Sequence, residues 1–332
     1  MNCIYEREWG FFCLKTIMIE INKIYHGDTL ATVRQFEAES IDCVITSPPY
    51  YQLRDYGFAY QWGLEKTYQE YLDKMIALMS ELKRVLKPTG TIWINLGDSY
   101  NGNKQGSTQG TSTGLLTGKI THNQVMVNKK TQQMPDKSLM LIPHRFAIRC
   151  IDELGLILRN DIIWAKPNGM PESVKDRFTK KHEFFFFFVK QQKYFFDLKA
   201  IRQKNLTKCK RSTLKMLDIN KYGKNSTFNG GNDYNPDGKN PGDVADFWDI
   251  TTKPSNEKHY ATFNADLIDR PIVAGCPVNG IVLDPFCGTG TTLVRALQLD
   301  RKVIGVDGKK EYVKIAEKRI KREQSILKLA LN

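Results

Sequence analysis

The residues with the clearest chemical potential form the stretch 46–50, Thr-Ser-Pro-Pro-Tyr, which directly follows a short apolar run. The run predicts a buried strand, and the prolines end it because neither can donate a hydrogen bond to a sheet. Each proline also moves the residue before it away from the helical region, so the turn is stiff. The carbonyls around Ser47 and Pro48 are then available as acceptors, and Tyr50 adds a flat ring beside them. Such a turn suits a planar group with an amino substituent, such as a nucleobase, although a stiff strand-to-loop corner explains the stretch equally well by itself.

A second candidate site is the stretch 284–292, Asp-Pro-Phe-Cys-Gly-Thr-Gly-Thr-Thr, which lies between an expected strand and an expected helix. Its glycines let the backbone turn tightly and bring the amides at the start of the helix against a ligand. Asp307 ends the next expected strand, where an acidic side chain suits hydrogen bonding to ribose hydroxyls. The two features together predict a nucleoside site, and the alternative is a glycine-rich corner of an α/β sheet.

The residues that follow the glycines distinguish between kinds of nucleotide. A phosphate-binding Walker loop needs lysine where Thr291 stands, and a dinucleotide fingerprint favours a small residue where Leu293 stands. S-adenosylmethionine contains a nucleoside and no phosphate, so it needs only the glycine turn and the ribose acid. It is therefore the cofactor that this stretch favours.

The bulk composition indicates a globular protein with a polyanionic partner. The chain has 332 residues, of which 41% are hydrophobic, and this length fits one large α/β domain with an insertion. We find no apolar run long enough to cross a membrane and no secretory signal. The seven cysteines form no CxxC pair, so we expect reduced thiols in a cytosolic protein and no metal site. The net charge of +13 favours binding to a polyanion.

Strands and helices alternate along most of the chain, which predicts a mostly parallel sheet. Strands are expected at 19–25, 44–45, 91–96, 156–164, 183–189, 281–284 and 302–307. Helices are expected at 29–36, 68–86, 138–154, 266–274, 291–299 and 311–329. Three segments do not fit the alternation: an N-terminal extension at 1–17, which is an added arm or an upstream translation start, a polar loop at 101–137 and a basic insertion at 199–245.

With both motifs in hand, the chain resembles the amino-group DNA methyltransferases, which modify exocyclic nitrogens in restriction-modification systems. The stretch 46–50 is similar to their catalytic motif, and 284–292 is similar to their S-adenosylmethionine motif. The catalytic motif comes first and the basic insertion lies between the two, which is the permuted order called the β class. The resemblance covers about residues 18–325. Weaker matches support it at 27–28, 161–168, 170–173, 182–183 and 261–264.

The resemblance implies a circularly permuted, Rossmann-like α/β fold of the S-adenosylmethionine-dependent methyltransferases, with helices on both faces of a mostly parallel sheet. Residues 18–198 would form the catalytic part, with the loop 101–137 mobile, and 246–332 the cofactor-binding part of the same domain. The insertion 199–245 would recognise the target sequence. Glu183 and its neighbour His182 are interpreted as structural residues at the mouth of a strand.

The resemblance also implies roles for single residues. Ser47 and the Pro48 carbonyl would hold the target amino group for in-line attack on the methyl group, Pro49 would complete the motif, and Tyr50 would stack on a base flipped out of the duplex. Rate acceleration would come from positioning and electrostatics. The expected cofactor-binding residues are Asp28 near the adenine, Asp307 at the ribose, Phe263 and Asn264 at the methionine end, and Thr46, Asp284, Pro285, Phe286, Gly288, Gly290 and Thr291 around the pocket. Cys43 could suggest a C5-cytosine mechanism, but it lies in mid-strand and we interpret it as a core residue.

The base and the DNA contacts follow from less specific features. Ser47 stands where adenine enzymes more often carry aspartate, so N4 of cytosine is preferred and N6 of adenine is the alternative. Five residues of the basic run are expected to contact phosphates, although a solvated charged surface would look the same: Lys204, Lys208, Lys210, Arg211 and Lys215. The expected partner is double-stranded DNA in a prokaryotic or phage-host cytoplasm, with a cognate restriction endonuclease and a second copy of the chain as further candidates.

Other classes of function stay open at this point. A non-catalytic DNA-binding protein could retain the fold, but it would be free to lose the intact motifs. An RNA or protein-glutamine methyltransferase is a closer rival, because related Pro-Pro-Tyr turns bind planar amides as well. The basic insertion and the permuted order favour DNA.

Overall fold

A computed structural model of the chain describes residues 18–58, 61–102, 134–169, 172, 174–202, 246–251 and 265–330. Several expectations lie outside these residues. They are the extension 1–17, most of the polar loop 101–137, the five basic residues of the insertion, and Phe263 with Asn264.

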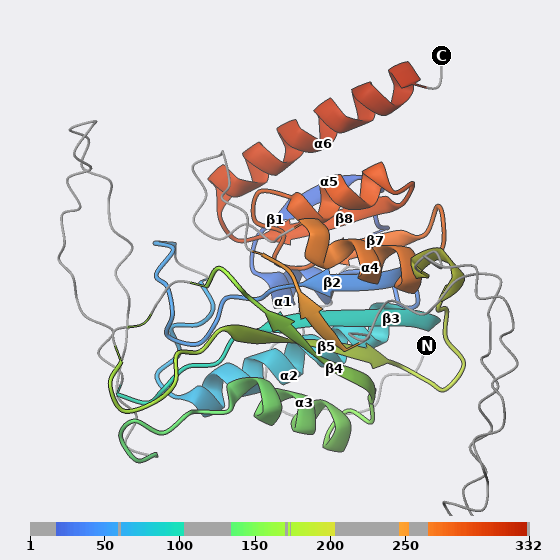
Figure 1. The fold of residues 1–332 in the computed structure, drawn as a ribbon. Coiled ribbons are helices and arrows are strands. Elements are labelled where there is room, and N and C mark those ends of the chain that lie inside the picture. The colour runs from blue at the N-terminus through green and yellow to red at the C-terminus, as the bar shows by residue number, and fades with distance from the viewer. Residues whose placement is uncertain are drawn as a thin grey trace, which may run out of the picture.

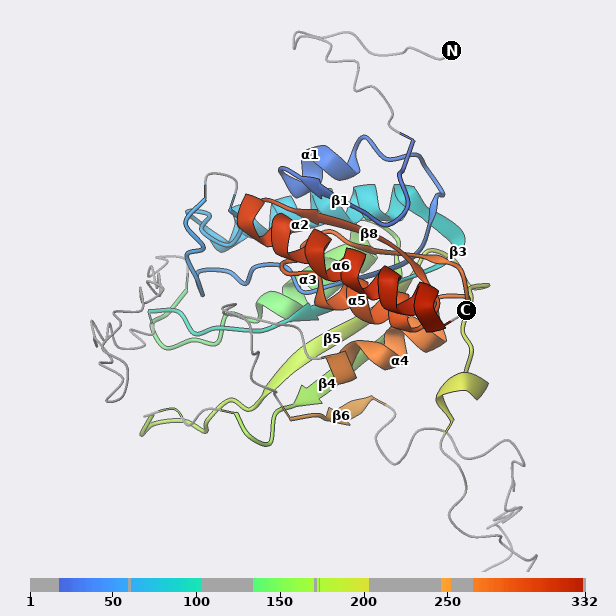
Figure 2. The same ribbon diagram turned by 90° about the horizontal axis from the view of Figure 1, so that it is seen from above.

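The described residues form one eight-stranded sheet (Figures 1 and 2). Its strands are β1 (Lys23–His26), β2 (Ile41–Thr46), β3 (Leu86–Leu96), β4 (Ile157–Ala165), β5 (His182–Val189), β6 (Phe247–Asp249), β7 (Ile281–Asp284) and β8 (Lys302–Asp307). Their order is β1-β8-β7-β2-β3-β5-β4-β6, and only β5 runs antiparallel to its neighbours. The predicted, mostly parallel sheet is confirmed. From the adjacent strands β7 and β2 the chain continues in opposite directions across the sheet, from β7 to β8 on one side and from β2 to β3 on the other. Ligands of open α/β sheets bind at such a reversal point.

Within the described residues, three helices cover each face of the sheet. The helices are α1 (Thr29–Val33), α2 (Tyr68–Val85), α3 (Ile142–Asp152), α4 (Ala265–Gly275), α5 (Thr291–Gln298) and α6 (Lys310–Ala330), and a 3-10 turn spans Lys199–Ile201. One core cluster joins α1, α2 and α3 to the sheet, and a second joins α4, α5 and α6 to the other face. Figure 1 shows the two helical layers on either side of the strands. No helix in the described part of the chain is both long and apolar enough for a membrane span.

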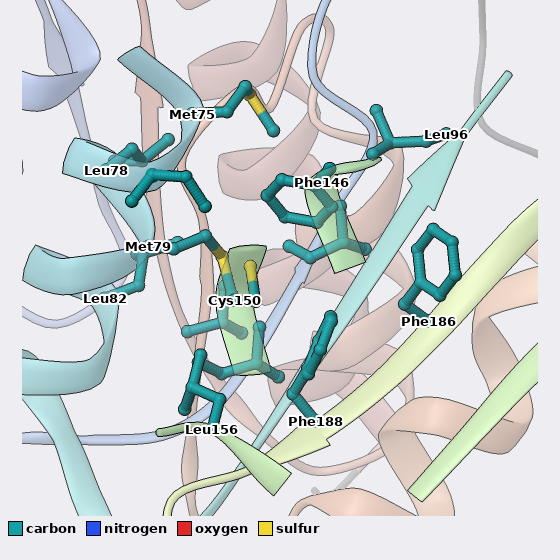
Figure 3. Packing of buried hydrophobic residues seen from close by; sticks show 14 of the residues in the cluster. Met75, Leu78, Met79, Leu82, Leu96, Phe146, Cys150, Leu156, Phe186 and Phe188 are labelled. Carbon is teal, nitrogen blue, oxygen red and sulfur yellow. The ribbon is translucent and has the colours of Figure 1, made fainter. Parts of the chain in front are cut away.

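The core beside α2 shows why this sequence forms a helix here. Thr67 caps the helix by accepting a hydrogen bond from the Glu70 amide, and apolar residues recur every three or four positions. Figure 3 shows this apolar face meeting α3 and the strands, through Met75, Leu78, Met79, Leu82, Leu96, Phe146, Cys150, Leu156, Phe186 and Phe188. Each such buried side chain contributes about 1.5–3 kcal/mol.

Strand β5 is buried on both faces. Phe186 and Phe188 pack toward α3, whereas Phe187 stacks on Trp93 with ring centroids 3.9 Å apart on the opposite face. A strand covered by helices on both sides reads as a continuous apolar run, which is what residues 184–189 are. The phenylalanine run thus lies inside the sheet, next to β3.

Several expected boundaries differ from the structure. Strand β1 begins at Lys23 instead of residue 19, because Asn22 takes a left-handed turn with φ of 61°. Strand β3 begins at Leu86, directly after α2, so the Lys-Pro-Thr-Gly segment that ends the helix belongs to the strand. Helices α1 and α3 are shorter at their ends than expected. Strand β6 was not predicted; it is only three residues long and pairs with the edge of β4.

Candidate active site

The two sequence motifs meet where β2 and β7 end side by side. The Thr46 hydroxyl donates to Asp284 Oδ1 at 2.6 Å, and the Phe286 amide donates to the same oxygen at 3.1 Å. Asp284 is only 4% exposed, and burial raises its pKa to about 6. This carboxyl therefore joins the Thr-Ser-Pro-Pro-Tyr turn to the glycine turn at the reversal point of the sheet.

The glycine turn is held against Asp307. The Gly288 amide donates to Asp307 Oδ2 and the Lys309 amide to Oδ1, both at 2.8 Å. Burial raises the pKa of Asp307, while these two backbone donors oppose the rise. Gly290 precedes α5 with φ of 82°, and a Cβ there would lie 2.9 Å from Ala316 Cβ. Both the left-handed turn and the close approach of α6 thus require glycine at this position.

Aromatic residues from the loop after β2 border the same turn. Trp62 meets Phe286 edge to face, with centroids 5.2 Å apart, and its indole nitrogen donates to Asp28 Oδ2 at 3.2 Å. Asp28 also caps α1 by accepting from the Ala31 amide at 2.9 Å. The Phe58 ring packs against the backbone of Gly308, so close that position 308 has no room for a side chain.

These residues fit S-adenosylmethionine. Asp307 offers a carboxylate for ribose hydroxyls, and the half-buried ring of Phe286, backed by the buried Trp62, offers apolar surface for an adenine. The Thr29 hydroxyl donates to the Pro285 carbonyl at 2.8 Å and so fixes the turn from the side of α1. Thr291 begins α5 where a triphosphate loop would carry lysine. The donor set therefore suits a nucleoside without a phosphate.

The candidate catalytic turn, residues 46–50, is held by a compact polar network. Ser47 Oγ lies 3.3 Å from both Tyr50 Oη and Asn95 Oδ1. Tyr50 Oη donates to Glu183 Oε2 at 2.6 Å and lies 2.9 Å from Asn95 Oδ1. Asn95 is buried near the end of β3, and its amide nitrogen donates to the Phe184 carbonyl at 3.1 Å, which orients its oxygen toward Ser47 and Tyr50.

The Tyr50 ring is fixed at both ends. A Cβ at Gly97 would lie 2.6 Å from Tyr50 Cε2, so only glycine lets the ring lie this close to the backbone. Burial, and after it the Glu183 carboxylate, raises the pKa of the Tyr50 hydroxyl well above its usual range, so the hydroxyl stays a donor. Lys166 forms an ion pair with the other oxygen of Glu183. The ring thus has one preferred orientation.

The prolines complete the turn. Pro48 is buried, and the Pro49 carbonyl accepts from the Tyr71 hydroxyl of α2 at 3.0 Å. The Pro49 carbonyl is therefore occupied by the protein. Cys43 is fully buried in β2, and burial raises the pKa of its thiol well above the usual range, so the interpretation as a core residue is confirmed.

Sequence reasoning missed several residues of this region. It gave Asn95 no role, and it interpreted Glu183 as structural without identifying what Glu183 holds; both residues contact the Tyr50 hydroxyl. The signal for Asn95 was available, because it is a polar residue within an otherwise apolar strand. Trp62 and Phe58, in the connection between β2 and α2, were not singled out either.

Comparisons with known proteins agree with this architecture. The family model for DNA methylases matches residues 41–318. The type II methyltransferase M.Cfr9I of Citrobacter freundii is 35% identical over 310 residues, covering 92% of this chain and 91% of that protein. The type II methyltransferase M.SmaI of Serratia marcescens is 34% identical and covers 91% of each chain. The chain therefore belongs to the DNA methylase family.

Solved structures share the fold. The PvuII DNA methyltransferase, described as cytosine-N4-specific, superposes with a TM-score of 0.59 at 20% identity, covering 92% of this chain and 95% of that one. A putative DNA modification methylase of Thermus thermophilus, solved with S-adenosylmethionine, gives 0.53 at 22% identity, covering 91% and 95%. The protein is thus a DNA methyltransferase with the expected α/β fold, and S-adenosylmethionine is its methyl donor.

Proposed function

We propose that this protein methylates the N4 amino group of cytosine within a specific sequence of double-stranded DNA. The observation that carries the proposal is the hydrogen bond between Thr46 and Asp284, because it joins the turn that bears Ser47 to the turn that would bind the cofactor. The amino group held at the first turn would then lie beside the methyl group held at the second. Base flipping brings the target out of the duplex.

Each residue of the catalytic turn has a separate role in this proposal. The Ser47 hydroxyl and the Pro48 carbonyl accept hydrogen bonds from the amino group, and this draws the nitrogen lone pair out of conjugation with the ring. S-adenosylmethionine, when bound, supplies an electrophilic methyl group. The Tyr50 ring, oriented by Asn95 and Glu183, offers the base a stacking face. Catalysis in this scheme rests on positioning and on preorganised acceptors.

The cofactor assignments extend the same scheme. Asp307 would bind the ribose, Asp28 would lie near the adenine, and the turn 284–291 would line the pocket. Phe263 and Asn264 would contact the methionine end. Asp307, Asp28 and the turn meet around one end of the sheet, which supports the assignment, because Gly288 binds Asp307 and the Gly27 amide donates to the Asp307 carbonyl at 3.1 Å.

Cytosine is preferred to adenine because of Ser47. Its neutral hydroxyl is typical of the N4-cytosine enzymes, and a cytosine-N4-specific enzyme is among the similar structures, although at 20% identity. Methylation of N6 of adenine by the same site is the alternative. A transfer assay decides between them.

The rest of the proposal concerns DNA recognition. Residues 18–198 and 246–332 would form one methyltransferase domain, and 199–245 would read the target sequence. The basic residues at 204–215 would contact phosphates, giving binding that weakens steeply with salt. The type II relatives support a cognate restriction endonuclease as a partner, in a prokaryotic or phage-host cytoplasm, with a second copy of the chain as a further candidate.

The test is transfer of labelled methyl from S-adenosylmethionine to unmethylated DNA, followed by digestion to nucleosides and mass spectrometry. N4-methylcytosine is the expected product. N6-methyladenine would refute the choice of base. Label in RNA alone, or tight binding of duplex and cofactor without any transfer, would refute the proposed activity. Ser47→Ala serves as the control, with cofactor binding retained and transfer lost.

A further inference from the structure

Phe178 is the most exposed large apolar side chain of the described residues, at 96%. It lies in the connection between β4 and β5. Figures 1 and 2 show this connection extending past the ends of the neighbouring strands, on the side of the sheet where the C-termini of β2 and β3 lie. Single exposed apolar residues are common and need no explanation by themselves. The surroundings of Phe178 make it unusual.

The loop around Phe178 is firmly anchored. Arg177 Nη1 donates to Glu172 Oε2 at 2.5 Å and to the Phe178 carbonyl at 3.0 Å, and its guanidinium lies 4.0 Å from the Tyr100 ring centroid. Lys137 pairs with Asp176 at 2.6 Å. The backbone on the N-terminal side of Phe178 is therefore tied down while its ring projects into solvent.

This loop borders the catalytic turn. The Lys180 side chain donates to the carbonyl of Asp98, which is the residue after Gly97, and Gly97 lies against the Tyr50 ring. Five residues after Phe178 comes Glu183, which binds the Tyr50 hydroxyl. Phe178 therefore stands at the rim of the site that would receive a flipped base.

The charge around the ring suits nucleic acid. Residues 174–181 read Val-Lys-Asp-Arg-Phe-Thr-Lys-Lys, with four basic side chains and one acidic one, and Lys175 and Lys181 are exposed. Cations on both sides of an exposed ring match a duplex, which presents phosphates on both sides of its stacked bases. An apolar residue placed between base steps is a common device of proteins that distort DNA.

We propose that Phe178 inserts into the gap that the flipped target nucleotide leaves in the base stack of the duplex. This inference rests on the proposed function. Extruding a base costs unstacking and unpairing energy. A ring that stacks on the bases flanking the gap, or on the base that was paired with the target, offsets part of that cost. It also slows the return of the target base into the duplex.

The test compares Phe178→Ala with a matched control, Val278→Ala. Val278 is 62% exposed and lies before β7, at the opposite end of the strands. Each variant is assayed in single turnover on two duplexes that carry the sequence methylated by the wild type. In one the target base is paired correctly, and in the other it faces a mismatch that already weakens its pairing.

Phe178→Ala is expected to methylate the matched duplex about 10- to 100-fold more slowly, which is the loss typical of removing an aromatic ring that stacks on a base. The mismatched duplex should bring the variant to within about threefold of the wild type, because extrusion costs least there. Cofactor affinity should be unchanged, and Val278→Ala should behave as the wild type on both duplexes.

Three results would overturn the inference. An unchanged rate on the matched duplex would make the ring dispensable. An equal loss on both duplexes would assign Phe178 to general binding or folding. A change from dimer to monomer in size-exclusion chromatography, with normal rates for the remaining active protein, would assign it to an interface between copies. Failure of the wild type to methylate any duplex would instead refute the proposed function.

Discussion

Replacing Glu183 by glutamine should slow methyl transfer without weakening cofactor binding. Glu183 Oε2 accepts the Tyr50 hydroxyl at 2.6 Å, and its other oxygen pairs with Lys166. Glutamine keeps the size of the side chain and removes the charge. Both members of the ion pair are largely buried, with side chains 15% and 20% exposed, so solvent replaces the lost interaction poorly.

The size of the expected loss in rate follows from the kind of contact that Glu183→Gln removes. A hydrogen bond to a charged group contributes about 1.5–3 kcal/mol. If that energy serves to keep the Tyr50 ring against Gly97 in the orientation that receives the base, its loss lowers kcat by about 10- to 100-fold, since about 1.36 kcal/mol corresponds to tenfold. Cofactor affinity should stay the same, because no described contact joins Glu183 to the glycine turn.

The assay is a double-mutant cycle in single turnover, with Glu183→Gln, Tyr50→Phe and the pair combined. Tyr50→Phe keeps the ring and removes the hydroxyl through which Glu183 would act. The double variant should therefore be about as slow as the slower single variant. Losses that multiply would show that Glu183 acts independently of the tyrosine, and the positioning argument would be wrong.

Three further predictions concern the cofactor site and DNA. Burial raises the pKa of Asp284 from 3.8 to about 6, so the folded state binds the carboxyl proton more tightly than the unfolded state does. The protonated carboxyl therefore contributes about 3 kcal/mol of stability at low pH, and this contribution is lost as pH rises through 6. Asp284→Asn should therefore gain in Tm relative to the wild type between pH 4 and pH 7 in cofactor-free protein, and parallel Tm profiles would contradict this. Gly308→Val should lower S-adenosylmethionine affinity at least about tenfold by displacing Phe58. The control Ala38→Val, at an exposed position before β2, should change affinity little, and calorimetric titration of both variants would test this. Changing both Lys210 and Arg211 to glutamine should reduce the slope of log affinity against log salt by about 2, measured by fluorescence anisotropy with a labelled duplex, and an unchanged slope would exclude phosphate contacts there.

The sequence predicted the elements whose signals are local. Helix α2 was expected almost to the residue, because its apolar spacing is regular and Pro88 follows it closely. Strands β7 and β8 were expected with the correct bounds, since each is an apolar run ending in aspartate. Strand β6 gave no comparable signal, because three residues cannot establish a period and its pairing with β4 is a tertiary contact.

The same distinction applies to the site. Ser47, Asp284 and Asp307 belong to short motifs, so their types and spacing were sufficient to single them out. The network around Tyr50 joins residues that are far apart in the chain, with Asn95 45 positions and Glu183 133 positions away from it. Sequence patterns do not report such contacts, and only the folded sheet brings β2, β3 and β5 together.

The most direct test of the central claim is to express the protein in a bacterial host that lacks DNA methylation and to map modified bases across the host genome. The account predicts N4-methylcytosine at nearly every copy of one short sequence, and none in cells that carry Ser47→Ala at the same expression level. An unmodified genome in cells with folded, cofactor-binding protein, or modification that survives loss of Ser47, would contradict it.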